Sequence, residues 1–399
     1  MLPLDPSQLT AILERFHTVA VRVLPERCLN RRHKESGCTL CLACPTGAVT
    51  AAGTSVQVNP EACVGCGLCA SVCPTEAFMV GGPALADLVR MAAEWRGRQL
   101  EAACPQRSAL NETSTEADAV VRLPCLAWLS PALMVALLAN GVTRLWLDDS
   151  HCSQCPLGTV NEAIVRAVRD AEALLEPFGR ERAIVLASLH RAATATKRHV
   201  PVLDARQPTY SRRDLFGALR RAAAQTAVAV MDQALPPTPS RSLEPHVPAQ
   251  RALLTTALSR LGTAAALPNV VVDLPLAQVV VGDECTACGL CAKLCPTGAL
   301  GVVQDEKWYT VDFRATRCLG EACRLCRLIC PVKAVTMSLR TPLADLLREV
   351  PTVMRSGELV PCSGCGVPTA RRGDEAVCHA CQWARRLRAG GENEMAGNA

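Results

Sequence analysis

Aromatic side chains and long apolar segments are both scarce in this 399-residue sequence. Phe, Trp and Tyr make up 3% of the residues, although hydrophobic residues as a whole reach 49%, enough for at least one ordinary core. No apolar run attains the roughly 18–20 residues that a membrane-spanning helix needs. The best candidate, residues 126–139, is interrupted by Ser130-Pro131, so it is predicted to be a core helix. The sequence therefore predicts no membrane span.

Signals for export and for nucleotide binding are also missing. Residues 1–10 lack the basic and apolar parts of a secretory signal peptide, so we expect a reducing cytoplasm. The internal Ser211-Arg212-Arg213 is similar to a twin-arginine motif, but it is interpreted as a helix start, with Ser211 as N-cap and Asp214 as its partner. No Gly-x-Gly-x-x-Gly motif follows an expected strand, and no residue set suggests acid–base or nucleophilic chemistry. Flavin or nicotinamide binding is unsupported, and an enzymatic activity of the chain's own is not expected.

Cysteine, in contrast, is abundant, and nearly all of the 24 cysteines occur at metal-ligand spacings. Two nearly identical runs have the spacing C-x2-C-x2-C-x3-C-P: Cys63-Val-Gly-Cys66-Gly-Leu-Cys69-Ala-Ser-Val-Cys73-Pro74 and Cys285-Thr-Ala-Cys288-Gly-Leu-Cys291-Ala-Lys-Leu-Cys295-Pro296. In this spacing a tight loop directs three thiolates to one iron–sulfur cluster, and the fourth cysteine serves a neighbouring cluster. The runs predict iron–sulfur sites rather than disulfides.

Each run has further cysteines nearby, so residues 25–82 and 276–340 are predicted to be two copies of one dicluster module. The chain here resembles bacterial-type 2×[4Fe–4S] ferredoxins and, in carrying the unit twice, polyferredoxins. The resemblance implies low-potential, one-electron transfer. In the second module it implies one cluster on Cys285, Cys288, Cys291 and Cys330, and another on Cys318, Cys323, Cys326 and Cys295. Strands are expected at residues 299–303 and 308–313, and the x4 spacing after Cys318 departs from the usual pattern.

In the first module the resemblance implies one cluster on Cys63, Cys66, Cys69 and Cys44, and another on Cys28, Cys38, Cys41 and Cys73. Two spacings depart from the pattern, because Cys28 lies ten positions before Cys38 and Cys41-x2-Cys44 is one residue short. A three-cysteine or degenerate site is the alternative for the second set. The insertion at 29–37 carries four basic residues, which either neutralise cluster charge or form a docking patch for an acidic partner: Arg31, Arg32, His33 and Lys34.

Residues 83–200 are predicted to form an α/β domain. Strands are expected at 100–103, 120–123, 142–147 and 183–187, and helices at 131–139 and 160–175. If the strands are parallel, four cysteines meet at the edge where open α/β folds bind ligands: Cys104, Cys125, Cys152 and Cys155. The pattern is similar to the small iron–sulfur subunit that links hydrogenases to heterodisulfide reductases. We expect a fifth cluster, [4Fe–4S] in preference to [2Fe–2S]; a zinc site or free buried cysteines are the alternatives. His151 either hydrogen-bonds a sulfur or is a surface residue.

Two C-x2-C knuckles, separated by 12 residues, mark the C-terminal part of the chain: Cys362-Ser-Gly-Cys365 and Cys378-His-Ala-Cys381. They fit a tetrahedral zinc ribbon, with rubredoxin-like iron as the alternative. The flanking arginines could contact phosphates, although only Trp383 is nearby for stacking on bases: Arg371, Arg372, Arg385, Arg386 and Arg388.

These segments predict an α+β multidomain protein. Its parts are an N-terminal amphipathic helix at 1–24, the dicluster module at 25–82, the α/β domain with a parallel sheet at 83–200, a helical connector with a proline-rich linker at 201–275, the second dicluster module at 276–340, and the zinc-ribbon-like module with a polar tail at 341–399.

The expected function is that of a multicluster electron-transfer protein. It would pass single electrons between redox partner proteins, such as oxidoreductase or hydrogenase-type subunits of an anaerobic complex. One alternative is a catalytic iron–sulfur reductase subunit similar to heterodisulfide reductase, and another is a redox-responsive nucleic-acid-binding protein. The formal charge of +5 supports the latter only weakly, because five clusters and a zinc ion would bring it to about −7.

Overall fold

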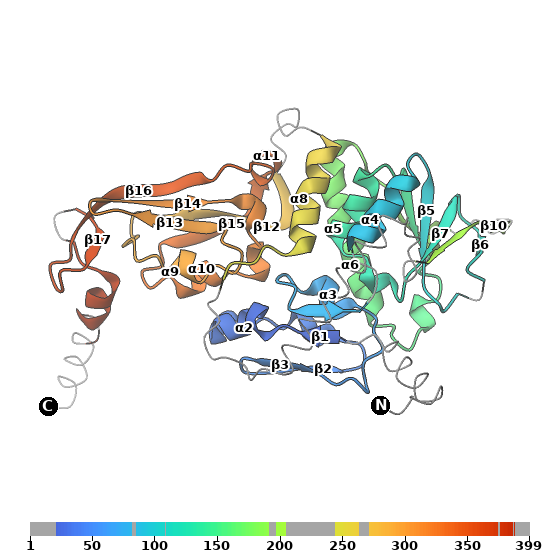
Figure 1. The fold of residues 1–399 in the computed structure, drawn as a ribbon, viewed down its shortest axis with the longest axis horizontal. Helices are drawn as coiled ribbons and strands as arrows, with labels where there is room; N and C mark the ends of the chain where they lie inside the picture. The colour runs from blue at the N-terminus through green and yellow to red at the C-terminus, as the bar shows by residue number, and fades with distance from the viewer. Residues whose placement is uncertain are drawn as a thin grey trace, which may run out of the picture.

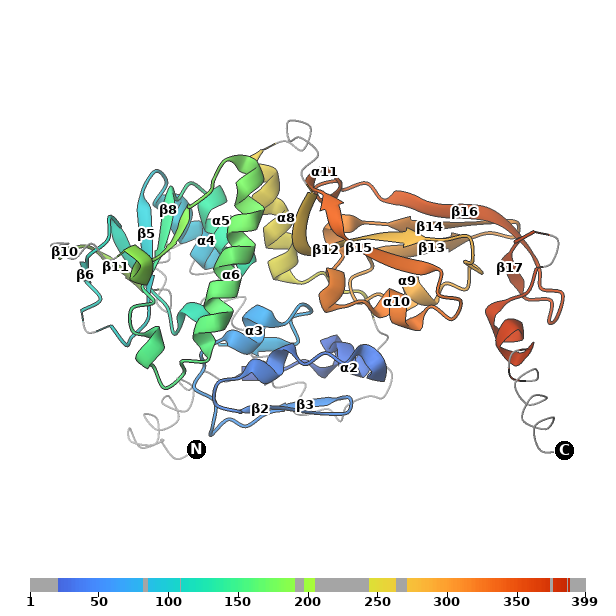
Figure 2. The same ribbon diagram turned by 180° about the vertical axis from the view of Figure 1, so that it is seen from behind.

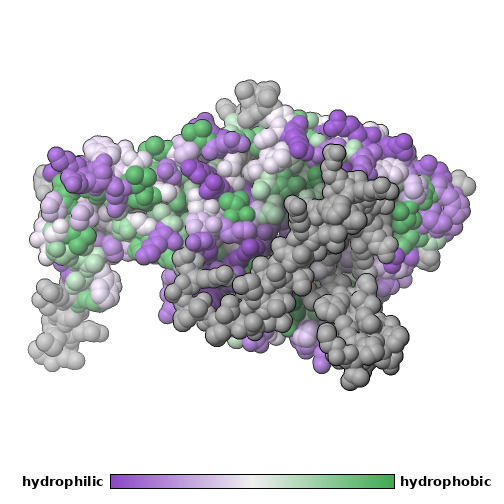
Figure 3. All heavy atoms as spheres, viewed as in Figure 1, coloured by the Kyte–Doolittle hydropathy of each residue, from purple (hydrophilic) through white to green (hydrophobic). Residues whose placement is uncertain are grey.

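The computed structural model describes residues 21–81, 85–107, 109–190, 197–204, 244–262, 271–373, 376–385 and 387. Three bodies lie side by side in both views: the first dicluster module, the α/β domain, and the second dicluster module with the C-terminal knuckles (Figures 1 and 2). The helix α8 (Ala249–Leu261) lies between the α/β domain and the second module, and the first module lies along both. Hydrophilic and hydrophobic residues are intermixed over the visible face of the second module (Figure 3).

The first module is built from two antiparallel strand pairs and two short helices. β1 (Val21–Val23) pairs with β4 (Phe78–Val80), and β2 (Val49–Ala52) pairs with β3 (Ser55–Val58). The helix α2 (Leu29–Arg32) begins directly after Cys28, and the helix α3 (Leu68–Val72) contains Cys69. Cysteine side chains share its small core with Val49, Val56 and Phe78.

The predicted N-terminal helix at 1–24 is wrong over its last residues. Residues 1–20 lie outside the described residues, but Val21–Val23 form strand β1. The β-branched valines favour an extended backbone, and their pairing with β4 closes the module. The module therefore begins several residues earlier than the predicted boundary at 25.

The α/β domain has a five-stranded, all-parallel sheet in the order β11-β7-β5-β8-β9. Its strands are β5 (Gln99–Ala103), β7 (Ala119–Arg122), β8 (Arg144–Leu147), β9 (Ile184–Leu186) and β11 (Val202–Asp204). The four predicted strands and their parallel direction are thus confirmed. The fifth strand, β11, corrects the predicted boundary at 200, because it adds to the sheet edge beside β7.

Helices pack on one face of this sheet. They are α4 (Leu85–Glu94), α5 (Pro131–Ala139), α6 (Val160–Leu175) and α8, which packs on α5. The predicted bounds of α5 and α6 are confirmed, and Ser130 Oγ accepts the N–H of Leu133 as the expected N-cap. The opposite face bears a small cluster of Ala117, Trp146 and Val185, near the paired strands β6 (Glu112–Thr113) and β10 (Arg198–His199).

The packing of α8 also corrects the predicted connector at 201–275. Leu254, Ala257 and Leu258 are buried in the core of the α/β domain, so this helix belongs to that domain. The predicted helix start at Ser211 and most of the proline-rich linker fall in 205–243, outside the described residues.

The second module repeats the topology of the first. β12 (Val271–Val281) pairs with β15 (Val335–Pro342), and β13 (Leu300–Gln304) pairs with β14 (Trp308–Phe313), all antiparallel. The short helices α9 (Leu290–Lys293) and α10 (Leu325–Ile329) follow the cysteine loops. Both predicted strands are confirmed, and β12 extends the module to residues before the predicted boundary at 276.

The C-terminal segment is not separate from this module, which corrects the predicted division at 340. After α11 (Leu343–Leu346), strand β16 (Thr352–Pro361) pairs with β14, and β17 (Pro368–Ala370) pairs with β16. The sheet order is β13-β14-β16-β17. Short 3-10 helices complete the described elements: η1 (Pro25–Arg27), η2 (Lys34–Ser36), η3 (Leu40–Ala43), η4 (Leu126–Trp128), η5 (Cys152–Gln154), η6 (Glu176–Phe178), η7 (Ala187–His190), η9 (Ala315–Arg317) and η10 (Gly320–Ala322).

The substitution Leu133→Ala is expected to destabilise the α/β domain by about 2–5 kcal/mol, because Leu133 of α5 is fully buried and its removal leaves a cavity. Chemical unfolding of the full chain, followed by circular dichroism, measures the loss. Leu189→Ala serves as the control, since Leu189 is 79% exposed. Equal effects of the two variants would contradict the position assigned to α5.

Candidate metal centres

Four cysteines gather at the carboxyl edge of the parallel sheet, and we name this set site A: Cys104, Cys125, Cys152 and Cys155. Cys104 directly follows β5, Cys125 lies shortly after β7, and the other two lie in the loop after β8. Burial raises the pKa of Cys152 to about 12, and the negative charges of Cys104 and Cys125 add to the rise. The parallel sheet therefore brings together cysteines that are up to 51 positions apart in the chain.

His151 lies at the surface. It is exposed and lines a neighbouring polar cavity of about 160 Å³, together with Glu101, Arg107 and Asp148. Arg107 Nη1 lies 3.0 Å from Glu101 Oε1 and 3.4 Å from Asp148 Oδ2. Burial raises the pKa of the Glu101 carboxyl, and this ion-pair network lies beside site A, because the Asp148 charge acts on Cys104.

Site B is the set that lines one cavity of the first module: Cys44, Cys63, Cys66 and Cys69. Burial, together with the smaller effect of the Cys66 charge, raises the pKa of Cys69 to about 12. Site B adjoins site A, since Cys66 packs in the same core as Cys125 and its charge contributes to raising the Cys125 pKa to about 11, after the larger effect of burial.

Site C is the second set of the first module: Cys28, Cys38, Cys41 and Cys73. Burial raises the pKa of Cys41 to about 11, with contributions from the charges of the other three. The long Cys28–Cys38 spacing is accommodated by α2 and η2, which fold back on the Cys38 loop. Asn30, 8% exposed, holds this fold: its Nδ2 donates to Cys38 O at 2.8 Å, and its Oδ1 accepts the Cys38 N–H at 2.9 Å.

Sites D and E are the two sets of the second module. Site D comprises Cys295, Cys318, Cys323 and Cys326, and site E comprises Cys285, Cys288, Cys291 and Cys330; each set lines its own cavity. Burial raises the pKa of Cys291 and of Cys323 to about 12. The structure thus brings together each set of four in the crossed arrangement that the ferredoxin resemblance implied.

Backbone amides point at the sulfurs of the C-P cysteines. The N–H of Ala77 donates to Cys73 Sγ at 3.3 Å, and in the second module Ala299 donates to Cys295 and Ala334 to Cys330, each at 3.2 Å. Amide donors stabilise negative sulfur. Buried thiols near neutral pH retain their protons unless a metal ion compensates the thiolate charge, so these donor sets fit thiolate-ligated iron.

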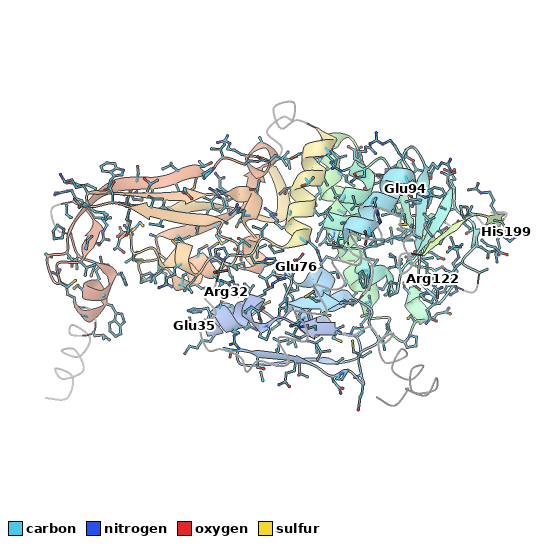
Figure 4. All side chains as sticks on the ribbon, in the orientation of Figure 1. Arg32, Glu35, Glu76, Glu94, Arg122 and His199 are labelled. Atoms are coloured by element: carbon cyan, nitrogen blue, oxygen red, sulfur yellow. The ribbon has the colours of Figure 1, made fainter. Side chains whose placement is uncertain are left out.

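The basic insertion of the first module reaches site D. Arg32 is 8% exposed and its Nη2 donates to Glu244 O at 3.1 Å, whereas Arg31 and Lys34 are exposed. Burial lowers the pKa of Arg32, and the thiolates of Cys295 and Cys323 act against that shift. Figure 4 shows Arg32 where the first module faces the second, so this cation compensates sulfur charge across the junction.

Helix α8 contributes a second buried cation at site D. Arg251 is 7% exposed; its Nε donates to Thr316 O and its Nη2 to Ala315 O, both at 2.7 Å. Burial lowers the pKa of Arg251 to about 10, and the charge of Cys318 acts against the shift. The neighbouring Gln250 ties the same helix to the first module, donating its N–H to Glu76 Oε1 at 2.8 Å.

The C-terminal knuckles converge on one point, and we name this set the ribbon site: Cys362, Cys365, Cys378 and Cys381. All four Sγ atoms lie within 4.8 Å of one another, and Cys365 and Cys378 are 3.6 Å apart. This spacing fits tetrahedral ligation with Zn–S bonds of about 2.3 Å. The knuckles pack on the site E loop, where Thr369 Oγ1 donates to Thr286 O at 3.1 Å.

The arginines near the ribbon site line a wide cavity of about 630 Å³ together with acidic residues. Arg371 Nε lies 2.7 Å from Glu358 Oε2, and Arg372 Nη1 lies 3.2 Å from Glu284 Oε2. These ion pairs weaken the case for phosphate binding. Arg386 and Arg388 lie outside the described residues.

The comparisons with known proteins support iron–sulfur binding in both modules. Residues 56–79 match the family model described as "4Fe-4S binding domain", and residues 282–334 match "4Fe-4S dicluster domain". The second match contains all eight cysteines of sites D and E. The search of curated proteins gave no match. The chain therefore carries ferredoxin-type iron–sulfur domains, which support an electron-transfer role. Every helix in the described part of the chain is too short or too polar to cross a bilayer.

Three residues at these sites were missed by the sequence analysis. Asn30 supports the Cys38 loop, Arg251 approaches site D from a distant helix, and Trp128 lies against the site B loop. Asn30 and Trp128 both stand close to a cysteine in the sequence, two positions after Cys28 and three positions after Cys125. Asn30 lies only eight positions from its partner Cys38, but the groups that Arg251 and Trp128 contact are distant in the chain, so no local pattern identifies those two.

Arg251→Met is expected to destabilise the full chain by about 2–4 kcal/mol, because the carbonyls of Ala315 and Thr316 lose a buried, charged hydrogen-bond donor. The free energy of unfolding of the cluster-loaded chain measures this loss. The matched variant Arg169→Met changes a side chain that is 76% exposed, and it is expected to have little effect. A similar small effect of both variants would show that Arg251 is not structurally important.

Proposed function

We propose that this protein is a multicluster electron-transfer protein with [4Fe–4S] clusters at sites B, C, D and E and a fifth iron–sulfur cluster at site A. Each cluster would supply one-electron redox chemistry. The ribbon site would hold a structural zinc ion. The partners would be redox proteins in a reducing compartment such as the cytoplasm.

The observation that carries this proposal is that the five sites form a continuous row. Site A adjoins site B through Cys125 and Cys66, and sites B and C share the small core of the first module. Sites D and E adjoin through Cys326 and Cys291, whose charges interact.

Arg32 and α10 complete the row between sites C and D. The insertion that follows Cys28 places Arg32 near the thiolates of site D, and η2 of the insertion contacts α10. A set of isolated structural clusters would not need this continuity across three bodies of the protein. Continuity supports electron transfer from the α/β domain to the second module, or in the reverse direction.

The two ends of the row differ in their surroundings. At one end Cys288 of site E is exposed beside the ribbon site. At the other end the polar cavity beside site A contains Glu101, Arg107 and Asp148. The first arrangement suits exchange with a protein partner at the surface.

The polar cavity also favours a second candidate function, reduction of a small substrate at site A. Its buried carboxylates and Arg107 could bind a polar molecule next to the cysteine set. Turnover of a simple disulfide by the reduced, cluster-loaded chain would support this function. Electron exchange without such turnover would favour the carrier function alone.

Anaerobically purified protein is expected to contain about 20 iron atoms and about one zinc ion per chain. The variant Cys155→Ser should lose about four iron atoms, because site A loses a ligand. Metal and sulfide analysis, with EPR of the reduced protein, measures both quantities. A folded wild-type chain without iron would refute the proposed function. About 16 iron atoms per wild-type chain would rule out only the cluster at site A.

Cys381→Ser is expected to lose zinc while retaining the iron of the other sites, since the ribbon site shares no cysteine with them. Zinc and iron are measured in the same preparation. Ser363→Ala, a change beside the ligand Cys362 that removes no sulfur, is the control. If Cys381→Ser instead lost about one iron atom and no zinc, the ribbon site would be a rubredoxin-like iron site.

A further inference from the structure

Both copies of the cysteine run contain a glycine at the same position, but the surroundings of this glycine differ between the two copies. Gly67 and Gly289 occupy the same position, between the second and third cysteines, and both have positive φ, +80° and +73°. A Cβ built on Gly289 would meet nothing within 4 Å. A Cβ built on Gly67 would lie 2.4 Å from Nε1 of Trp128. The indole of Trp128 therefore occupies the space directly against the site B loop.

Trp128 belongs to the α/β domain and stands at the junction with site A. It is the last residue of η4, and its backbone N–H donates to Cys125 O at 3.2 Å. Helix α3, which carries Cys69, contacts η4. The side chain thus lies between a cysteine of site A and the loop that supplies Cys66 and Cys69 to site B.

The indole N–H of Trp128 is buried, and no protein atom in the described part of the chain accepts it. An unpaired buried donor costs about 1–3 kcal/mol, so native structures rarely leave one without a partner. The other buried indole in the same domain follows this rule, because Trp146 Nε1 donates to Gln99 Oε1 at 2.8 Å. Trp128 therefore needs an acceptor that the described part of the chain does not supply.

We propose that the Trp128 indole N–H donates a hydrogen bond to a sulfur of the cluster held at site B, and that it raises the reduction potential of this cluster. The inference rests on the proposed function, which places that cluster at Cys44, Cys63, Cys66 and Cys69. Hydrogen bonds to cluster sulfurs stabilise the more negative, reduced state and so raise the potential. Through this hydrogen bond, Trp128 of the α/β domain tunes the cluster of the neighbouring first module.

The variant Trp128→Phe keeps an aromatic ring in this position but removes the donor. We expect the reduction equilibrium of one cluster to shift about tenfold toward the oxidised form, a fall of ~59 mV in its potential. An EPR-monitored redox titration of the anaerobic full chain measures the potentials of all clusters. Trp146→Phe is the matched control: it removes an indole that already has a protein acceptor, and it should move no cluster potential.

A second pair of variants tests the same contact from the other side. Gly67→Ala would drive the indole away from the loop, so it should reproduce the potential shift of Trp128→Phe. Gly289→Ala imposes the same positive-φ strain in the loop of site E, where no indole is present, and it should leave the potential of the site E cluster unchanged. This pair keeps the test decisive if Trp128→Phe lowers the stability of the chain.

The outcomes separate this inference from the proposed function. Wild-type protein without iron would refute the function itself. Full iron content with no potential shift in Trp128→Phe, or with the same shift in Trp146→Phe, would overturn only the role of Trp128. A single cluster shifted in both Trp128→Phe and Gly67→Ala, with both controls silent, would establish it.

Discussion

The burial of cysteine sulfur in sets of four is the constraint on which this structure depends. Burial raises the pKa of cysteines in every one of sites A to E, to about 11 or 12 at Cys41, Cys125 and Cys291. Thiolates can persist in such places only where a cation compensates their charge. In the first module cysteine sulfur also fills part of the core, so metal binding and folding are expected to be coupled there.

Polar contacts, as well as apolar packing, hold the three bodies together. Helix α8 packs its leucines into the α/β domain, but it contacts the dicluster modules through Gln250 and Arg251. Arg32 reaches Glu244 O from the first module in the same way. Side-chain hydrogen bonds to backbone carbonyls fix position strictly, because a small displacement would leave a buried group unpaired. Such fixed spacing is what the proposed row of redox sites would require.

Local patterns predicted much of the fold. The bounds of α5 and α6, the Ser130 cap and the four parallel strands all followed from periodicity and capping signals. The errors occur where a strand's partner is far away in the chain. Val21–Val23 pair with β4, β11 joins β7 across some 80 residues, and β16 joins the sheet of the second module. A short extended segment carries no mark of its partner, so such boundaries could not be placed from the sequence.

In the two dicluster modules, cysteine spacing alone determined which cysteines belong to which run. The resemblance to ferredoxins implied that the last cysteine of each run completes the cluster of the other run. Spacing suffices for this because loop geometry is local. Tertiary structure decided what surrounds each set: Asn30 within the long insertion, Arg32 and Arg251 beside site D, and Trp128 against Gly67. Except for Asn30, these neighbours come from other modules, and their positions depend on packing between bodies, which no single stretch of sequence encodes. The sequence thus determined the cysteine sets that we propose as metal sites, whereas the tertiary structure decided the order of these sets and the charges and donors around each one.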